Sequence, residues 1–329
     1  MSQNRAQHNT NPPARHGAMR RIGLALGTLA VLALLLTAAA SLYLIDYALA
    51  RDSQPDDQAL AHVLDQAPQA APWVDSLRRE GALHDTTITG PHGLRLHALW
   101  ARAGRPTART AIIVHGYKVQ ALGMMHIGYL YHHNLGFNIL LPDLSAHGHS
   151  QGSHIGMGWN ERFEVLRWVD EAAHLFGDSA RVVLHGISMG AATVMNVAGE
   201  DCPPRVRCVV EDCGYTSVWD EFSGEARKRF GLPPFPVLYA SSALTRLLHG
   251  WSFGQASSLK QVKRSRLPIF FIHGDSDDFV PSWMVHPLHE AARADKQLWI
   301  TPGCAHAQSY YHYPQEYTRR VAQWTGRYM

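Results

Sequence analysis

The sequence has few cysteines and none of the short motifs that mark cofactor- or metal-dependent enzymes. Four of its 329 residues are cysteine, and none forms a C-x-x-C pair. It contains no glycine-rich dinucleotide fingerprint, phosphate-binding loop or H-E-x-x-H helix, despite 21 histidines. We therefore expect no cofactor and no catalytic metal. A local disulfide between Cys202 and Cys208 is conceivable, but these side chains can equally be small buried hydrophobic groups.

The excess of positive charge is confined to the start of the chain. The formal net charge is +3, but residues 1–21 contain four of the 30 basic residues and no acidic residue. The remainder has 26 basic and 27 acidic residues, so it shows no bias toward a polyanion. This balance argues against nucleic acid as a partner.

A long uncharged segment follows this basic start. No charged residue occurs from Ile22 to Ile45, and a helix of that length reaches ~36 Å, enough to cross a bilayer. Arginines precede the segment and aspartates follow it, so the positive-inside rule predicts a cytoplasmic N-terminus and a periplasmic or extracellular remainder. A cleaved signal peptide is the alternative, because small residues before Ser41 and Arg51 fit a cleavage site. We favour a single-pass membrane anchor.

The chain divides into four parts by composition. Residues 1–21 are predicted to be disordered, 22–45 to anchor the protein, 46–84 to form a helical linker, and 85–329 to form one α/β domain. Residues 217–266 interrupt the pattern of that domain and are long enough to form a small cap over the strand ends.

Short β-branched strands alternate with helical segments in this domain. Two strands, at 86–89 and 94–100, flank a turn signal and predict a hairpin. The six later strands are expected at 110–114, 138–142, 181–185, 206–211, 268–273 and 298–301. The intervening and closing helices are expected at 121–134, 161–175, 188–198 and 311–324. This alternation predicts an α/β fold with a mostly parallel sheet and helices on both faces.

A serine motif lies between one of these strands and its following helix. Gly186-Ile-Ser188-Met-Gly190 matches G-x-S-x-G, in which a sharp strand-to-helix turn exposes the serine. The motif is short enough to occur by chance, but here it has the strand before it and the helix after it that the turn requires. We therefore predict that Ser188 is a nucleophile.

The partners of a serine nucleophile are expected after later strands. In this type of site the chain order is serine, acid, histidine. The fifth of the six strands runs into Asp275, Asp277 and Asp278, and the sixth runs into His306. The carboxyl ends of parallel strands meet at one edge of the sheet, where such proteins place their sites. The sequence thus predicts a triad of Ser188, an acid near 277, and His306 as the general base.

Two backbone N–H groups should stabilise the oxyanion that forms during acyl transfer. The residue after the nucleophile, Met189, supplies one. We expect the other from Tyr117, because the strand at 110–114 runs into His115-Gly116-Tyr117, where the glycine lets the backbone approach the substrate. A plain glycine turn is the alternative interpretation of this loop.

Several longer strings resemble those of a known group. The chain is similar over about residues 85–326 to bacterial, membrane-anchored α/β-hydrolases related to the serine-aminopeptidase and acyltransferase-like branches of that superfamily. Beyond the triad, the resemblance rests on residues 141–150, 155–159, 211–217 and 272–281. It implies the α/β-hydrolase fold with a small helical cap. The pattern H-G-x-x-D-x-x-V-P implies that Asp277 is the acid, rather than Asp275 or Asp278. Where the group often has Arg-Gly-His-Gly, this chain has Ser145-Ala146-His147-Gly148.

The predicted function is hydrolysis of a small-molecule or acyl substrate through an acyl-serine. A carboxylic ester, a thioester or a small amide all fit. A serine peptidase or an acyltransferase would use the same triad, and an acyltransferase would have to exclude water. The complete triad disfavours a non-catalytic binding protein on this fold.

The segment 217–266 is rich in large apolar side chains. Some must hold the segment onto the domain, but others are expected to line an apolar acyl pocket. Phe235 and Trp251 are the positions that we expect to contact substrate.

Overall fold

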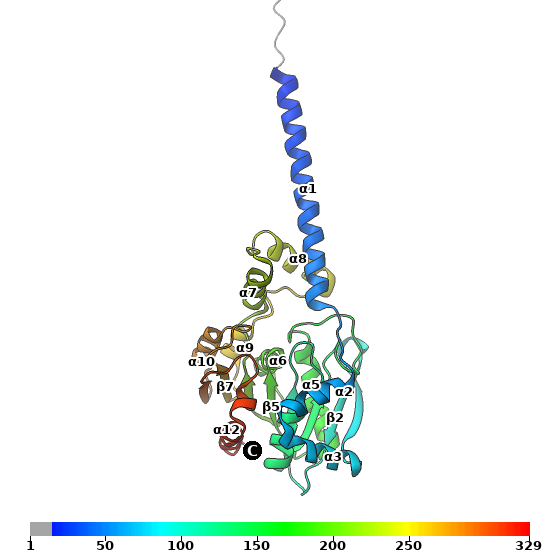
Figure 1. Ribbon diagram of the computed structural model, residues 1–329, viewed down its shortest axis with the longest axis vertical. Helices are drawn as coiled ribbons and strands as arrows, with labels where there is room; N and C mark the ends of the chain where they lie inside the picture. The colour runs from blue at the N-terminus through cyan, green and yellow to red at the C-terminus, as the bar shows by residue number, and fades with distance from the viewer. Residues whose placement is uncertain (1–14) are drawn as a thin grey trace, which may run out of the picture.

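The computed structural model describes residues 15–329 and shows one long helix projecting from a compact domain (Figure 1). Helix α1 spans Arg15–Leu49, so the last part of the segment predicted to be disordered is helical, and residues 1–14 lie outside the described residues. Helix α1 contains no proline, a residue that would end or kink it. The helix therefore continues beyond both ends of the uncharged run Ile22–Ile45.

Helix α1 has an exposed apolar part and a packed end. Among the described residues, Met19–Leu49 is the one helix whose length and composition would allow it to cross a membrane. Most of its large apolar side chains are exposed, as at Leu34 and Leu36. Ser41, Ile45 and Leu49 recur every four residues and are buried, so the last two turns pack against the domain.

Two helices connect α1 to the sheet. They are α2 (Asp56–Gln66) and α3 (Ala71–Arg79), with the short turn η1 (Pro68–Ala70) between them. Their apolar side chains, among them Leu60, Val63 and Trp73, are buried in a cluster on one face of the sheet.

The sheet has eight strands in the order β1-β2-β4-β3-β5-β6-β7-β8. The strands are β1 (His84–Thr89), β2 (Arg95–Ala101), β3 (Arg109–Val114), β4 (Asn138–Pro142), β5 (Arg181–Ile187), β6 (Val206–Asp212), β7 (Ile269–Gly274) and β8 (Lys296–Thr301). β2 pairs antiparallel with both β1 and β4, and all other pairs are parallel. The predicted hairpin and the mostly parallel sheet are thus confirmed.

Helices cover both faces of the sheet because its central strands are apolar on both sides. In β3, Ile112 and Val114 join one buried cluster, whereas Ala111 and Ile113 join the other. The covering helices are α4 (Met125–Tyr129), α5 (Glu161–Phe176), α6 (Met189–Ala198), α10 (Val285–Ala291), α11 (Ser309–His312) and α12 (Pro314–Thr325), with the short turn η5 (Ser282–Met284) before α10.

Three helices fill the segment between β6 and β7. They are α7 (Val218–Phe230), α8 (Val237–His249) and α9 (Ser258–Arg264). α7 and α8 stand to one side of the end of α1, and α8 packs against it (Figure 1). The Ser41 hydroxyl donates a hydrogen bond of 3.2 Å to the Val237 carbonyl. This segment between β6 and β7, the insertion, therefore packs against the end of α1.

The structure differs from the sequence prediction in the helix expected at 121–134. This stretch is divided into the turn η3 (Ala121–Met124), the short helix α4 and the π-helical turn η4 (Leu130–Asn134). The possible Cys202–Cys208 disulfide is not formed, and all four cysteines are free.

Candidate active site

Ser188 lies in a sharp turn between β5 and α6. Its backbone angles are φ 58° and ψ −119°, a positive φ that side-chain-bearing residues rarely adopt. A Cβ on Gly186 would lie 2.1 Å from the Gly190 carbonyl oxygen, and one on Gly190 would lie 2.1 Å from that of Val114. Only glycine fits at both positions. Backbone strain of this kind persists where the surrounding structure enforces it, commonly at active sites.

Ser188, His306 and Asp277 form a hydrogen-bonded chain. The Ser188 Oγ lies 2.8 Å from His306 Nε2, and His306 Nδ1 lies 2.7 Å from Asp277 Oδ2. An ionised carboxylate only accepts hydrogen bonds, so Nδ1 donates to Asp277 and Nε2 accepts from the Ser188 hydroxyl. The three residues follow β5, β8 and β7, so the parallel sheet brings together side chains that are far apart in the sequence.

The surroundings of Asp277 keep its carboxyl group ionised. Burial alone would raise the pKa of this fully buried side chain, but hydrogen bonds with His273 and His306 outweigh that effect and lower the pKa to about 2. The Oδ1 atom also accepts hydrogen bonds from the backbone N–H groups of Phe279 and Val280, both at 3.0 Å. The side chain is therefore fixed in position as well as charged.

His273 is a second buried imidazole beside Asp277, and sequence reasoning did not single it out. Its Nε2 donates a hydrogen bond of 2.9 Å to the Val280 carbonyl and lies 3.4 Å from Asp277 Oδ2. Burial lowers the pKa of His273, but the neighbouring carboxylates of Asp277 and Glu211 raise it above its ordinary value. The signal was its place at the start of the H-G-x-x-D string.

The other two carboxylates after β7 have different surroundings. Asp275 is exposed and its Oδ1 accepts a hydrogen bond of 2.7 Å from the Gly303 N–H. Asp278 is exposed and forms an ion pair of 2.9 Å with Lys228. Of the three, Asp277 is the one that contacts His306.

The loop that follows β3 lies against Ser188. A Cβ on Gly116 would be 3.4 Å from both the Ser188 Cβ and the Ile187 carbonyl oxygen, so the backbone at this point touches the serine turn. Tyr117, the next residue, lines the space around Ser188, and its hydroxyl donates a hydrogen bond of 2.7 Å to the Ala48 carbonyl at the end of α1. Met189 begins α6 and is buried beside the serine.

Two buried histidines hold this loop in place. His115 donates from Nδ1 to the Gly116 carbonyl at 2.8 Å and accepts at Nε2 from the Leu144 N–H at 3.0 Å. His147 accepts at Nε2 from the Lys118 N–H at 3.2 Å. Burial lowers the pKa of both rings, that of His147 to about 3, so both stay neutral and keep an acceptor nitrogen.

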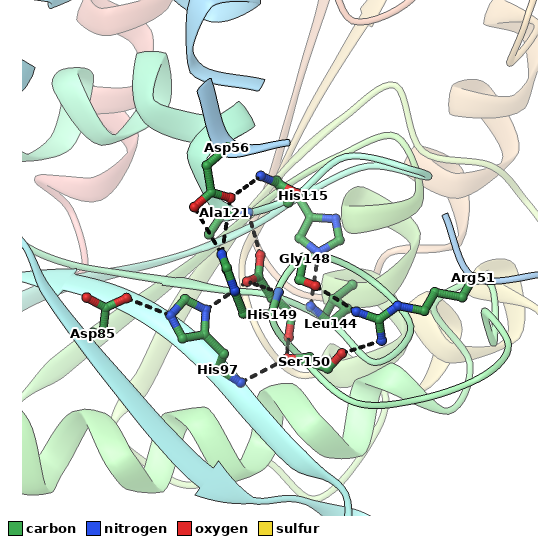
Figure 2. A network of polar contacts seen from close by, with 12 residues as sticks. Arg51, Asp56, Asp85, His97, His115, Ala121, Leu144, Gly148, His149 and Ser150 are labelled. Atoms are coloured by element: carbon green, nitrogen blue, oxygen red, sulfur yellow. Dashed lines mark hydrogen bonds and ion pairs between the residues drawn. The ribbon is translucent and has the colours of Figure 1, made fainter. Parts of the chain in front are cut away.

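A polar network is centred on Asp143, and Figure 2 shows its members His97, Ala121 and His149. The Asp143 Oδ1 accepts a hydrogen bond of 2.7 Å from the Ala121 N–H, and its Oδ2 accepts from His97 Nδ1 at 2.7 Å and from the His149 N–H at 3.0 Å. Burial would raise the pKa of Asp143, but these hydrogen bonds lower it. Arg51 donates to the carbonyls of the same loop, which ties the end of α1 to it (Figure 2).

Ser188 borders two cavities. The first has a volume of about 240 Å³ and mostly apolar walls, and it extends from Ser188 and Met189 to the end of α1. The second has a volume of about 530 Å³ and more hydrogen-bonding groups, and it includes His306, Gln308 and residues of α2. Tyr117 lines both. A substrate bound at Ser188 would therefore have space on two sides of its reacting carbon.

The structure places neither Phe235 nor Trp251 in the wall of the apolar cavity. Phe235 is 73% exposed, and Trp251, which lies between α8 and α9, is buried against Phe253. Composition identified the right segment but could not tell which of its aromatic side chains face inward. The cavity is lined instead by Phe222 and Phe253, together with others from α1, α7 and α8.

Within residues 15–329, one group of three side chains lies close enough to share a metal ion. The potential ligand atoms of Cys213, Asp277 and His306 all lie within 4.8 Å of one another. Asp277 and His306 are already hydrogen-bonded to each other, and burial raises the pKa of the Cys213 thiol well above its ordinary value, whereas a metal requires the thiolate. These three residues therefore fit a metal poorly.

Known proteins share this architecture. Residues 112–232 match a family model described as alpha/beta hydrolase fold. The chain is similar to the uncharacterized protein YqkD of Bacillus subtilis, with 28% identity over 221 residues, which cover 67% of this chain and 72% of YqkD.

Two solved structures have the same fold. The esterase Pf2001 of Pyrococcus furiosus is 23% identical, with a TM-score of 0.61 over 75% of this chain and 93% of the esterase. The acylaminoacyl peptidase of Pyrococcus horikoshii is 14% identical, with a TM-score of 0.55 over 74% of this chain and 40% of the peptidase. The protein therefore has the α/β-hydrolase fold, as its sequence predicts.

Proposed function

We propose that this protein is a serine hydrolase that cleaves a carboxylic ester, a thioester or a small amide through an acyl-serine intermediate. The observation that carries the proposal is the hydrogen-bonded chain from Ser188 through His306 to Asp277, at 2.8 and 2.7 Å, on a strained turn bordered by two cavities. A nucleophile, a base and a group that orients the base are the minimum that acyl transfer requires.

In the acylation step, His306 Nε2 removes the proton from the Ser188 hydroxyl as Oγ attacks the carbonyl carbon of the substrate. The resulting oxyanion accepts hydrogen bonds from the backbone N–H groups of Met189 and Tyr117. The imidazolium then donates its proton to the leaving oxygen, sulfur or nitrogen, and the acyl group stays on Ser188. Asp277, which stays ionised, stabilises the imidazolium.

In the deacylation step, water replaces the departed alcohol, thiol or amine. His306 removes a proton from that water as its oxygen attacks the acyl carbon. The bond from that carbon to Ser188 Oγ then breaks, the imidazolium returns the proton to Oγ, and the acid is released. A peptidase would use an amide in the first step, and an acyltransferase would admit a second alcohol or amine in place of water. All steps use only side chains and backbone groups of this chain.

We further propose that α1 anchors the protein in a membrane and that the hydrolase domain lies outside the cytoplasm. The uncharged run Ile22–Ile45 and the arginines before it support this arrangement. In this arrangement residues 46–84 are the linker, residues 85–329 are the catalytic domain, and residues 217–266 are its cap.

A substrate screen tests the reaction class. The full-length protein in detergent should hydrolyse p-nitrophenyl esters, and the same preparation should be compared on thioesters and aminoacyl amides of matched acyl group. The expected result is turnover of at least one series, and none by Ser188→Ala. Equal turnover by both proteins would refute the proposal.

A further inference from the structure

We propose that the substrate is a long-chain acyl ester that resides in a membrane, with its acyl chain in the apolar cavity and its alcohol portion in the second cavity. This inference rests on the proposed function and names the substrate class of that site. Three features of the structure carry it: the walls of the cavity, the attachment of α1, and the surface beside them.

The apolar cavity is built partly from the helix that would cross the membrane. Leu44, Ile45, Tyr47 and Ala48 of α1 line it, opposite residues of α7 and α8. The remaining apolar side chains of the wall are Tyr117, Met157, Met189, Tyr215, Phe222, Ala226, Phe230, Leu238, Phe253, Phe279 and Val280. Four ionisable side chains, Lys118, Glu221, Glu225 and Arg229, also line the cavity, and Arg229 is ion-paired with Glu225. The wall is otherwise apolar and favours an alkyl chain, because each buried methylene adds to binding.

Helix α1 is fixed to the site and is not joined to it by a flexible tether. Ile45 and Leu49 are buried in the core, and the Leu49 carbonyl accepts a hydrogen bond of 2.7 Å from the Ile155 N–H. The Ala48 carbonyl accepts from the hydroxyl of Tyr117, the residue that we propose for the oxyanion site. The cavity therefore stays at one height relative to the apolar part of the helix.

That height corresponds to the membrane surface. About 20 apolar residues cross the hydrocarbon core of a bilayer, and the uncharged run ends at Ile45, so Leu44–Ala48 would lie at the headgroup level. An acyl chain could then pass from the bilayer along α1 to Ser188 without entering bulk water.

The insertion beside α1 presents a surface that fits the same boundary. Five large apolar or aromatic side chains are exposed on or near α7 and α8: Phe230, Phe235, Tyr239, Leu247 and Leu248. Soluble monomeric proteins rarely gather so many in one region. Basic residues lie among them. Arg227 and Arg246 are exposed, where anionic headgroups would attract them, whereas Lys228 and Arg229 are ion-paired with Asp278 and Glu225. Helix α8 lies beside α1 (Figure 1), and Leu42 and Tyr43 of α1 are likewise exposed.

The second cavity has mixed walls, with apolar side chains and more hydrogen-bonding groups than the first cavity, and we assign the alcohol portion to it. It is the larger of the two and is lined by side chains that donate or accept hydrogen bonds, among them Gln54, His62 and Gln66 from the segment that follows α1. The carbonyl carbon at Ser188 would then have its alkyl chain on the membrane side and its polar alcohol on the other.

The test compares long and short esters in one membrane environment. Full-length protein is placed in lipid nanodiscs of phosphatidylethanolamine and phosphatidylglycerol, and kcat/KM is measured for p-nitrophenyl palmitate and p-nitrophenyl butyrate. Two variants narrow the cavity from α1, Ala48→Trp and Leu44→Trp. Both positions are half-buried, and the second substitution adds less volume. Ala39→Trp, at an exposed position on the same helix, is the matched control.

The wild-type protein is expected to prefer palmitate. Each cavity variant should lower the palmitate-to-butyrate ratio by about tenfold or more, the equivalent of losing contact with roughly two methylene groups, and Ala39→Trp should leave the ratio unchanged. An unchanged ratio in both cavity variants, or a wild-type preference for butyrate, would overturn this inference. Labelling by a fluorophosphonate probe separates failure of this inference from failure of the proposed function. A wild-type protein that is not labelled would refute the proposed function, whereas labelled proteins with an unchanged ratio would refute only the substrate class.

Discussion

The three carboxylates after β7 give the residue-scale test of the site. Asp277 alone contacts His306, whereas Asp275 and Asp278 are exposed. We expect Asp277→Asn to lower kcat by about 10⁴-fold, because the amide no longer fixes the tautomer or balances the imidazolium. Asp275→Asn and Asp278→Asn should change kcat by only a fewfold. A loss confined to Asp275→Asn would contradict the assignment.

A buried acid on β6 gives a prediction about pH. Burial raises the pKa of Glu211 to about 8, although its Oε2 accepts a hydrogen bond of 3.0 Å from the Gly214 N–H. Because the folded pKa lies above the ordinary value, folding takes up a proton between these values. The contribution of Glu211 to stability is therefore complete below a pH of about 4.5 and is lost as the pH rises toward 8.

Glu211→Gln removes this titration. In urea unfolding, the free energy of unfolding of the variant minus that of wild type should be more positive at pH 8 than at pH 5, so that the variant gains stability relative to wild type as the pH rises. The exposed Glu290→Gln change is the control and should show no such trend. The same difference at both pH values for Glu211→Gln would show that this group does not titrate on folding.

At this scale the sequence located the hydrogen-bonded chain of Ser188, His306 and Asp277 better than the groups that support it. Ser188 and His306 could be named because the backbone after a strand leaves few positions for them. His273 and Asp143 could not be assigned their contacts, because each depends on the packing of loops from distant parts of the chain. Which aromatic side chains enter a cavity also depends on helix rotation, and for that reason the expectation for Phe235 and Trp251 was not met.

The turn around Ser188 gives the element-scale prediction. Gly186→Ala and Gly190→Ala would each force a Cβ to within 2.1 Å of a backbone oxygen. We expect each to lower the free energy of unfolding by about 3 kcal/mol or more and to abolish activity. Gly224→Ala, in the exposed interior of α7 with no atom within 4 Å of the new Cβ, should raise stability by about 0.5–1 kcal/mol.

These variants are compared by thermal or urea unfolding of the purified proteins. If Gly186→Ala were as stable as Gly224→Ala, the turn would have a different backbone from the one described. Full activity of Gly186→Ala or of Gly190→Ala would have the same meaning.

The elements themselves follow closely from local pattern. All eight strands lie close to where the sequence predicted them. The central strands could be located because strands buried on both faces are continuously apolar, and the largely exposed edge strand β1 because a turn signal follows it. The helix at 121–134 is broken because residues in that stretch also fold against α2 and the Asp143 network, which no local pattern shows. The end of α1 at Leu49 reflects packing against the domain, whereas the prediction at Ile45 used charge alone.

At the scale of the whole molecule, the packing of α1 bears on its processing. Cleavage before Arg51 would remove Ile45 and Leu49 from the core and Ala48 from the hydroxyl of Tyr117. We therefore expect the mature protein to keep α1 and to remain in the membrane fraction. N-terminal sequencing of the purified protein checks this, and a mature N-terminus at Ser41 or Arg51 would show a cleaved signal instead.

The orientation of the molecule is a separate prediction. Reporter fusions after residue 60 should be active when the reporter functions outside the cytoplasm and inactive when it functions inside, because four arginines precede the apolar run. The reverse pattern would place the catalytic domain in the cytoplasm.

The central claim is that Ser188 is an activated nucleophile, and covalent labelling tests it most directly. The full-length protein is treated with a fluorophosphonate probe, which reacts with serine hydroxyls that a neighbouring base activates. Peptide mapping should then find the probe on Ser188, and Ser188→Ala, folded as judged by its unfolding transition, should not be labelled. Absence of labelling in the wild-type protein, or equal labelling of Ser188→Ala, would contradict the account.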